Sequence, residues 1–145
     1  MGHVSTVYGI IIGPTWKTED YHKLQRLNKQ IIDGMAVDDK SYPWITKNMF
    51  LVPDPDADKM YRDQAIVFGA SYKSVECEWT EWLQKFESVI NKLYWSSVTI
   101  HLNTELIGAY TYEWAYHVKQ VDDWSSGNIA PVTEWVFKGG PRSFF

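Results

Sequence analysis

The stretch from Leu106 to Val118 constrains the fold of this chain more than any other part of the sequence. Read with a period of two, it places on one side Leu106, Gly108, Tyr110, Tyr112, Trp114, Tyr116 and Val118. Such alternation is typical of a long β-strand, because successive side chains of a strand point to opposite faces of the sheet. The sequence therefore predicts a sheet with an aromatic ladder on one face.

Apolar runs and turn signals on either side of this strand predict an α+β fold. We expect strands at 7–13, 48–52, 64–73, 97–102, 106–118 and 132–138, and helices at about 19–33 and 74–94. This order matches a two-layer ferredoxin-like antiparallel sheet with both helices on one face and an extended C-terminal hairpin. With 145 residues the chain is long enough for one core, so residues 1–145 are expected to form a single domain.

Both predicted helices carry one apolar face that we expect to pack on the sheet. In the first, Thr18 is the candidate N-cap, and the apolar stripe is formed by Tyr21, Leu24, Leu27, Ile31 and Met35. In the second, Ser74 is the candidate N-cap, and the stripe is formed by Trp79, Trp82, Leu83, Phe86, Val89, Ile90, Leu93 and Tyr94. Each large side chain gains roughly 1.5–3 kcal/mol on burial, so the eight of the second helix together gain on the order of 12–24 kcal/mol, which is comparable with the entropy lost on ordering that helix. The second helix therefore depends on the sheet beneath it.

The turn after Leu102 decides which face of the sheet receives the aromatic ladder. If Asn103–Glu105 form an odd-numbered loop, Leu102 pairs with Leu106 and Ile100 with Gly108, and the aliphatic and aromatic rows share the core. A two-residue loop shifts the pairing by one residue, and the ladder becomes an exposed aromatic surface. We expect the first register because it pools the apolar side chains, and the second remains the alternative.

The sequence carries no pattern of a known metal site. The alternating acids Asp54, Asp56 and Asp58 begin like a calcium loop, but Lys59 stands where a sharp turn needs Gly and Ala65 where a bidentate Glu is required. The four histidines and the one cysteine lack the spacing of a zinc site. We therefore expect neither a metal nor a cofactor.

Composition limits the class of partner. Eighteen acidic against fourteen basic residues give a formal net charge of -4, which disfavours nucleic acid and anionic membranes as partners. One cysteine excludes an intrachain disulfide, and no apolar segment of about 20 residues is present. These features predict an intracellular, cytoplasmic protein. Aromatic residues form 16% of the chain, and they serve protein interfaces as well as cores.

These features together predict a small protein-binding module that acts stoichiometrically on another protein, as an inhibitor, an immunity-type protein or a regulator. The candidate contact residues are Tyr110, Tyr112, Trp114, Tyr116, Asp54, Asp56 and Asp58. In size and acidity the chain is similar to small immunity proteins and phage-encoded inhibitors, which indicates a bacterial or viral source by analogy. The ladder and the appended strands also suit self-association, so a homo-oligomer or an assembly component is a further expectation.

An alternative hypothesis is a small-ligand-binding protein or an enzyme with a pocket near His101, Glu113 and His117, opposite the ladder. The segments 3–5 and 101–103 are similar to the paired His-x-Thr or His-x-Ser motifs of two-histidine phosphoesterases, although the second ends in Asn. The sequence contains no Gly-rich phosphate loop, no Gly-x-Ser-x-Gly and no His-Glu-x-x-His. The pattern therefore favours binding over catalysis, and we assign no catalytic residue.

Overall fold

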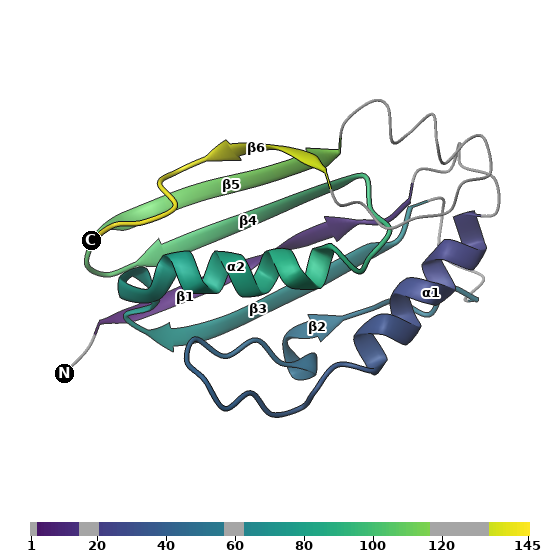
Figure 1. Cartoon of the computed structure of the whole chain (residues 1–145), viewed down its shortest axis with the longest axis horizontal. Helices are drawn as coiled ribbons and strands as arrows, with labels where there is room; N and C mark the ends of the chain where they lie inside the picture. Colours follow the sequence, from purple (N-terminus) through teal and green to yellow (C-terminus); the bar gives the residue numbers. More distant parts are fainter. Residues whose placement is uncertain (1–2, 15–20, 57–62, 117–133) are drawn as a thin grey trace.

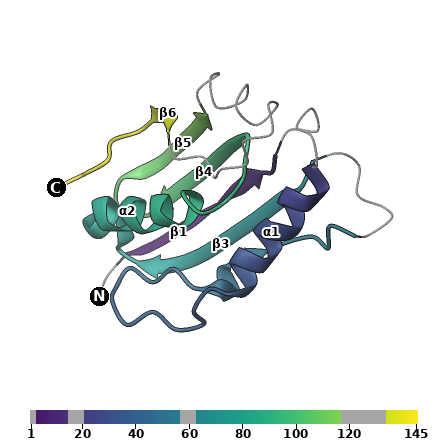
Figure 2. The same ribbon diagram turned by 45° about the vertical axis from the view of Figure 1, so that its right-hand side comes forward.

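The computed structural model describes residues 3–14, 21–56, 63–116 and 134–145, which form an α+β structure with an open antiparallel sheet (Figures 1 and 2). The helices are α1 (Tyr21–Asp33) and α2 (Trp79–Ile90), with short 3-10 helices η1 (Lys47–Met49) and η2 (Val75–Glu78). The strands are β1 (Val4–Ile12), β2 (Phe50–Leu51), β3 (Ala65–Lys73), β4 (Ser97–Thr104), β5 (Gly108–Tyr116) and β6 (Trp135–Gly139). Neither described helix has the length and apolar character needed to cross a membrane.

The six strands lie in the order β2-β3-β1-β4-β5-β6, and each neighbouring pair is antiparallel. The strand β1 lies between β3 and β4, and α2 connects β3 to β4 across it. In both views α2 lies along one face of the sheet (Figures 1 and 2). On that face Val7 and Ile11 of β1 are fully buried.

The turn between β4 and β5 confirms the odd-numbered loop but corrects its position. The loop is Glu105–Ile107, and Leu102 pairs with Tyr110 while Ile100 pairs with Tyr112. The predicted pairs were wrong by four residues along β5, because β4 continues to Thr104 and β5 begins only at Gly108. That glycine adopts a φ of 93°, which other residues rarely tolerate, and so fixes where the chain reverses. Because the loop is odd, the aliphatic row and the aromatic ladder still share one face.

The aromatic side chains of β5 interlock with those of α2 in the core. Trp82 stacks between Trp79 and Phe86, with ring centroids 5.0 and 5.1 Å apart, and Phe86 lies 5.5 Å from the ring of Trp114. The indole N–H of Trp114 donates to Glu87 Oε2 at 3.0 Å, so its polar atom is satisfied inside the protein. The helix and the strand therefore stabilise each other through ring contacts.

The second helix begins later than the sequence pattern predicts. The α-helical residues start at Trp79, after the 3-10 turn η2, and Ser74 makes no capping hydrogen bond. Ser74 instead adopts a left-handed conformation with φ of 53°, and its hydroxyl accepts the backbone N–H of His3 at 3.0 Å. The helix ends at Ile90, yet Leu93 and Trp95 beyond it are fully buried. The predicted apolar face is therefore turned toward the core, and part of it lies in the segment that follows the helix.

The helix α1 buries polar side chains that the predicted apolar stripe did not contain. Its buried residues are Leu24, Gln25, Asn28 and Ile32, whereas Thr18 lies outside the described residues. The amide of Asn28 donates to the carbonyl oxygen of Tyr94 at 2.7 Å and accepts the backbone N–H of the same residue at 2.8 Å. A pair of hydrogen bonds therefore ties α1 to the segment after α2, and Ile32 joins the common core.

We expect Trp114→Ala to lower the free energy of unfolding by about 3–5 kcal/mol, because it removes a fully buried ring from the aromatic stack. Glu113→Ala is the matched control, since Glu113 is exposed on the other face of the same strand, and its effect should stay within about 0.5 kcal/mol. Urea unfolding measures both. Equal losses for the two variants would contradict the observed orientation of β5.

Candidate interaction surfaces

Three of the aromatic residues predicted to contact a partner, Tyr110, Tyr112 and Trp114, lie on the core side of β5. Tyr112 and Trp114 are fully buried, and Tyr110 is half-buried with its ring 4.9 Å from Phe144. The side chain of Tyr116 lies outside the described residues. Burial raises the pKa of Tyr112 to about 12, and its hydroxyl donates to the carbonyl oxygen of Pro141 at 2.6 Å. Tyr112 and Trp114 are therefore core residues, and a partner could reach them only if the sheet opened.

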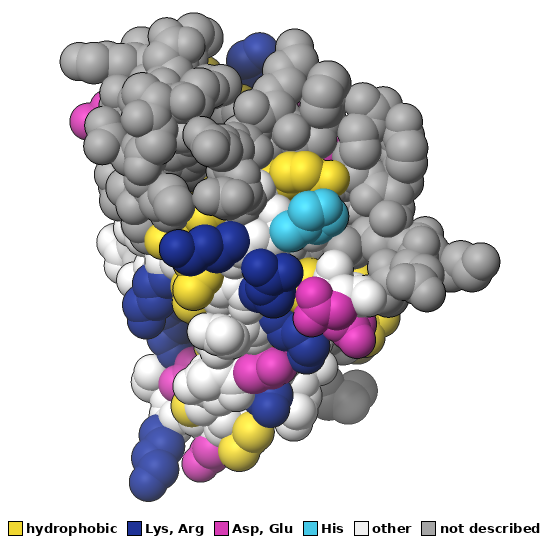
Figure 3. Space-filling view, turned by 90° about the vertical axis from the view of Figure 1, so that its right-hand side faces the viewer, with side chains coloured by type: hydrophobic (Ala, Val, Ile, Leu, Met, Phe, Trp, Pro, Cys, Tyr) yellow, Lys and Arg dark blue, Asp and Glu magenta, His cyan; other side chains and the backbone are white. Residues whose placement is uncertain are grey.

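Two of the acidic residues predicted to contact a partner, Asp54 and Asp56, lie near α1. Asp56 accepts a long hydrogen bond of 3.5 Å from Arg26, and its own N–H donates to Asp54 Oδ1 at 3.0 Å, whereas Asp58 lies outside the described residues. A second ion pair joins Lys29 to Asp33 on α1. Figure 3 shows basic and acidic side chains intermixed on this side of the molecule. This side thus presents both signs of charge to a partner.

Two residues of the predicted ligand pocket, His101 and Glu113, lie on an open strand face. His101 Nδ1 is 3.0 Å from Thr111 Oγ1, and Glu113 faces the same side of the sheet one row further along β5. His117 lies outside the described residues. Three hollows of about 290, 210 and 310 Å³ are found beside α1, and neither His101 nor Glu113 lines them. In the described ranges no group of three His, Cys, Asp or Glu is placed to hold a metal ion.

The face of the sheet opposite α2, here called the outer face, carries several exposed apolar side chains. They are Val4, Tyr8, Leu51, Val67 and Val136, with exposed fractions from 40 to 69%. In the described part of the chain no helix covers this face (Figures 1 and 2). Monomeric proteins leave few such patches uncovered, so an exposed apolar sheet face indicates a contact surface.

Across the outer face, the paired side chains change from apolar at β2 to charged at β6. One row crosses all six strands and contains Leu51, Val67, Ile10, Thr99, Glu113 and Lys138. Its β2, β3 and β1 positions are aliphatic, and its β5 and β6 positions are an acid opposite a base. The row is therefore apolar toward the β2 edge of the sheet and charged toward the β6 edge.

The aromatic ring of Tyr8 lies in the middle of the outer face. Tyr8 is 43% exposed, its ring centroid lies 5.1 Å from that of His101, and its hydroxyl accepts a hydrogen bond from Asn103 at 3.4 Å. On the other flank Tyr8 pairs with Gly69, which has no side chain to cover the ring. The ring is therefore held on one side and open on the other, as suits an interface anchor.

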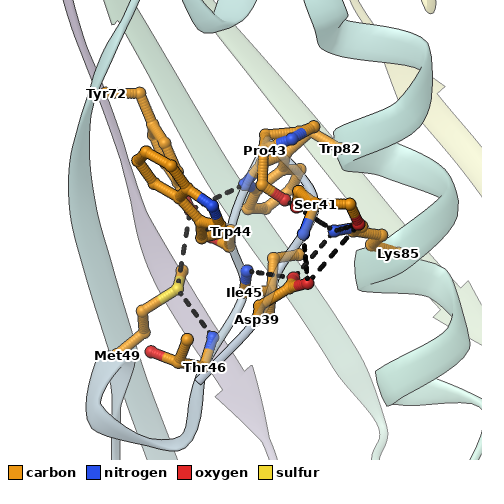
Figure 4. Close-up of polar contacts among 10 residues, drawn as sticks. All are labelled: Asp39, Ser41, Pro43, Trp44, Ile45, Thr46, Met49, Tyr72, Trp82 and Lys85. Carbon is orange, nitrogen blue, oxygen red and sulfur yellow. Dashed lines mark hydrogen bonds and ion pairs between the residues drawn. The ribbon is translucent and has the colours of Figure 1, made fainter. Parts of the chain in front are cut away.

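A second exposed apolar surface lies on residues 36–47, here called the latched loop, and contains the exposed side chain of Trp44. Its ends are joined by a hydrogen bond of 3.0 Å from the N–H of Lys47 to the carbonyl oxygen of Ala36. Lys85 extends from α2 into the loop (Figure 4). Its ammonium group donates to Asp39 Oδ2 at 2.7 Å, to the carbonyl and hydroxyl oxygens of Ser41 at 2.6 and 3.0 Å, and to the carbonyl of Pro43 at 3.0 Å. One cation therefore holds three loop residues.

Asp39 is the anionic counterpart of Lys85 within the latched loop. Its carboxylate also accepts the backbone N–H groups of Ile45 and Ser41, each at 3.2 Å. Burial opposes ionisation, but the hydrogen bond from Lys85 and those two N–H groups outweigh it and lower the pKa of Asp39 below 3.8. The carboxylate of Asp39 is consequently ionised at neutral pH.

Tyr42 and Tyr72 fix the part of the latched loop around Trp44, yet the side chain of Trp44 stays half exposed. Tyr72 donates to the carbonyl oxygen of Trp44 at 2.6 Å and accepts the indole N–H of Trp82 at 3.1 Å, while Tyr42 donates to the carbonyl of Lys73. Burial raises the pKa of Tyr72 to about 12. Trp44 itself is 50% exposed. Sequence reasoning missed this residue, although an aromatic and apolar run at 42–45 inside an acidic irregular segment is a usable signal.

These observations define an α+β protein with two separate apolar surfaces, one on the sheet and one on the latched loop. No protein-family model, curated protein or solved structure matches the chain. The chemistry of the two surfaces is therefore the basis for a functional inference.

We expect Asp39→Asn to lower the free energy of unfolding by about 1–2 kcal/mol at neutral pH, because it removes a charge-assisted hydrogen bond. Since the folded-state pKa of Asp39 is lowered, its contribution is present above about pH 4 and is lost as the pH falls through that pKa. The difference in unfolding free energy between the wild type and Asp39→Asn should therefore become smaller at acidic pH. Urea unfolding across this pH range measures it.

Asp33→Asn is the matched control for this prediction, because it removes the exposed partner of Lys29 and should change stability by less than about 0.5 kcal/mol. If the difference in unfolding free energy between the wild type and Asp39→Asn stayed constant with pH, the carboxylate charge of Asp39 would not be what stabilises the latched loop.

Proposed function

We propose that this chain is a small intracellular protein-binding module that acts stoichiometrically on another protein through the outer face of its sheet. The supporting observation is the row of aliphatic side chains Leu51, Val67 and Ile10, of which the first two are exposed, with the exposed Tyr8 next to Ile10 on β1. A binding role of this kind, as an inhibitor, an immunity-type protein or a regulator, needs a complementary surface and no chemistry.

The charges on the outer face favour a protein over a nucleic acid. Its charged side chains are of both signs, with Glu113 opposite Lys138 in register and Lys73 at the far end of β3. Phosphate binding instead needs clustered Lys and Arg. The ring of Tyr8 lies beside the ring of His101 on β4 and beside Gly69 on β3, so the described outer face carries no extended series of rings on which successive bases would stack. An apolar protein surface is therefore the partner that this face fits best.

We further propose that the order β2-β3-β1-β4, with α1 and α2 in the connections, makes this a ferredoxin-like two-layer fold extended by a C-terminal hairpin of β5 and β6. The support is the strand order with its antiparallel pairs and the contribution of both helices to one core. In that architecture the helices seal one face of the sheet and leave the other free for a ligand.

Val67→Glu tests this function, because it places a charge in the middle of the aliphatic row without touching the core. We expect the wild-type chain to retain a partner protein at fixed stoichiometry from lysate of its source, and Val67→Glu to lose it by at least about tenfold in affinity. Affinity capture followed by analytical ultracentrifugation of the reconstituted complex measures both quantities.

Leu106→Glu is the matched control, since Leu106 has a similar exposed fraction in the turn between β4 and β5. Binding should survive in this control. If the wild-type chain retained no partner, or if Val67→Glu bound as well as Leu106→Glu, the proposal would fall. A homodimer that Val67→Glu dissociates would replace the foreign partner by a second copy of the chain.

A further inference from the structure

The strand β6 forms one outer edge of the sheet (Figures 1 and 2). Among the described residues β5 is the strand that pairs with it, so the backbone N–H and C=O groups along its other side have no strand partner there. Such an edge is a template on which a further strand can pair. We propose that β6 pairs antiparallel with β6 of a second copy of this chain, about a two-fold axis at Val136.

A two-fold axis limits how two identical edge strands can pair. When the joined strands continue one sheet, the axis is normal to that sheet, so one residue of β6 lies opposite its own copy and every other pair is made twice. The two side chains of each pair then point to the same face, and the helices of both copies lie on one side of the joined sheet. Residues 134 to 138 are the candidates for the position on the axis.

The charges along β6 select one of these positions. An axis at Glu134 or at Lys138 places like charges opposite each other, which destabilises the strand pair. An axis at Trp135 or at Phe137 places Val136 opposite a charged side chain. An axis at Val136 instead places Glu134 opposite Lys138 on both sides of it, and Val136 opposite itself. In this register β6 is complementary to its own copy in charge and in polarity.

The outer face of the joined sheet gains an alternating row of charges. Within one chain Lys138 pairs with Glu113 of β5. In the joined sheet Glu134 of the second copy lies on the other side of Lys138, so the lysine lies between two acids. A lysine on an edge strand usually opposes pairing with another chain, and here the acid of the second copy offsets that effect. Val136, which is 49% exposed in the single chain, is covered by its own copy.

The core side of the joined sheet gains a pair of aromatic rings. Trp135 and Phe137 are only half-buried in the single chain, where the sheet ends at β6. The ring of Phe137 is held from within, with its centroid 5.0 Å from that of Trp114 and 4.8 Å from the guanidinium carbon of Arg142. In the register about Val136, Trp135 lies opposite Phe137 of the second copy. Cross-strand aromatic pairs of this kind stabilise antiparallel sheets.

The opposite edge of the sheet suits such pairing less well. The strand β2 at that edge has two residues, which is too short for an extended ladder of hydrogen bonds. Beyond β2, the carbonyl oxygen of Lys73 at the end of β3 already accepts the hydroxyl of Tyr42. The five residues of β6 therefore form the longer free edge in the described part of the chain.

Association through β6 goes beyond the proposed function. Leu51, Val67 and Tyr8 lie on β2, β3 and β1, away from β6, and they stay uncovered when two β6 strands pair. Because the axis is normal to the sheet, the outer faces of both copies point the same way. The dimer therefore offers two equivalent surfaces to a partner, and each inference can fail without the other.

The test uses two charge reversals in the full chain, Glu134→Lys and Lys138→Glu. We expect the wild type to dimerise reversibly in analytical ultracentrifugation at concentrations up to about 1 mM, a range that also detects a weak dimer. Each variant alone places like charges opposite each other at two positions, and should weaken the dimer by at least about tenfold. An equimolar mixture of the two variants restores both opposite-charge pairs, and should form a heterodimer with an affinity close to that of the wild type.

Asp38→Lys is the matched control, because it makes the same change in charge at an exposed residue of the latched loop and should leave the dimer intact. Circular dichroism checks that each variant is folded, since Lys138→Glu also faces Glu113 in its own chain. If Lys138→Glu does not fold, Val136→Lys takes its place. It brings two lysines together at the axis and should also weaken the dimer by at least about tenfold.

A wild-type chain that stayed monomeric at every concentration would overturn the proposal. So would a dimer that kept its affinity in Glu134→Lys, or a mixture of the two folded charge variants that stayed monomeric. A dimer that Val67→Glu dissociated and Glu134→Lys did not would use the outer face instead of the edge, and would overturn the pairing of β6 while supporting a contact through the outer face.

Discussion

The stack of aromatic rings between α2 and β5 is the interaction on which the rest of the structure depends. Trp82, Phe86 and Trp114 contact one another in series, and the neighbouring strands pack their aliphatic residues around them. Neither element buries enough area alone, because a single helix or a single strand exposes its apolar side to water. The helix and the strand are therefore stable only together, and the sheet acquires one sealed face.

Because one face of the sheet is covered, the side chains of the sheet that are available for contacts outside the protein lie on the opposite face. The same alternation that directs Trp114 into the core directs Glu113 and Thr111 outward, and in β1 it directs Tyr8 outward between Val7 and Gly9. The latched loop follows the same logic at shorter range, since burying Pro43 and Ile45 forces Trp44 into solvent. Both exposed surfaces are thus consequences of how the core is filled.

Local sequence patterns predicted most of the elements because period and burial are coupled. The spacing from Trp79 to Ile90 predicted α2, and the alternation in 106–118 predicted β5 and the side on which its rings lie. The candidate surfaces were less predictable. The pattern singled out the rings of β5, which fill the core, and passed over Tyr8 and Trp44, because exposure depends on which neighbouring elements cover a residue.

The sequence by itself determined the α+β class of the fold, because hydrophobic periodicity is a local property of the chain, and it favoured an odd-numbered hairpin loop because that register pools the apolar side chains. Only the tertiary structure decided that Asn28 is buried against the segment after α2 and that Lys85 pairs with Asp39, forty-six positions away. Such polar contacts join segments far apart in the chain, and no spacing rule connects their residues. They exist because packing first brings the segments together, and buried polar groups then require partners.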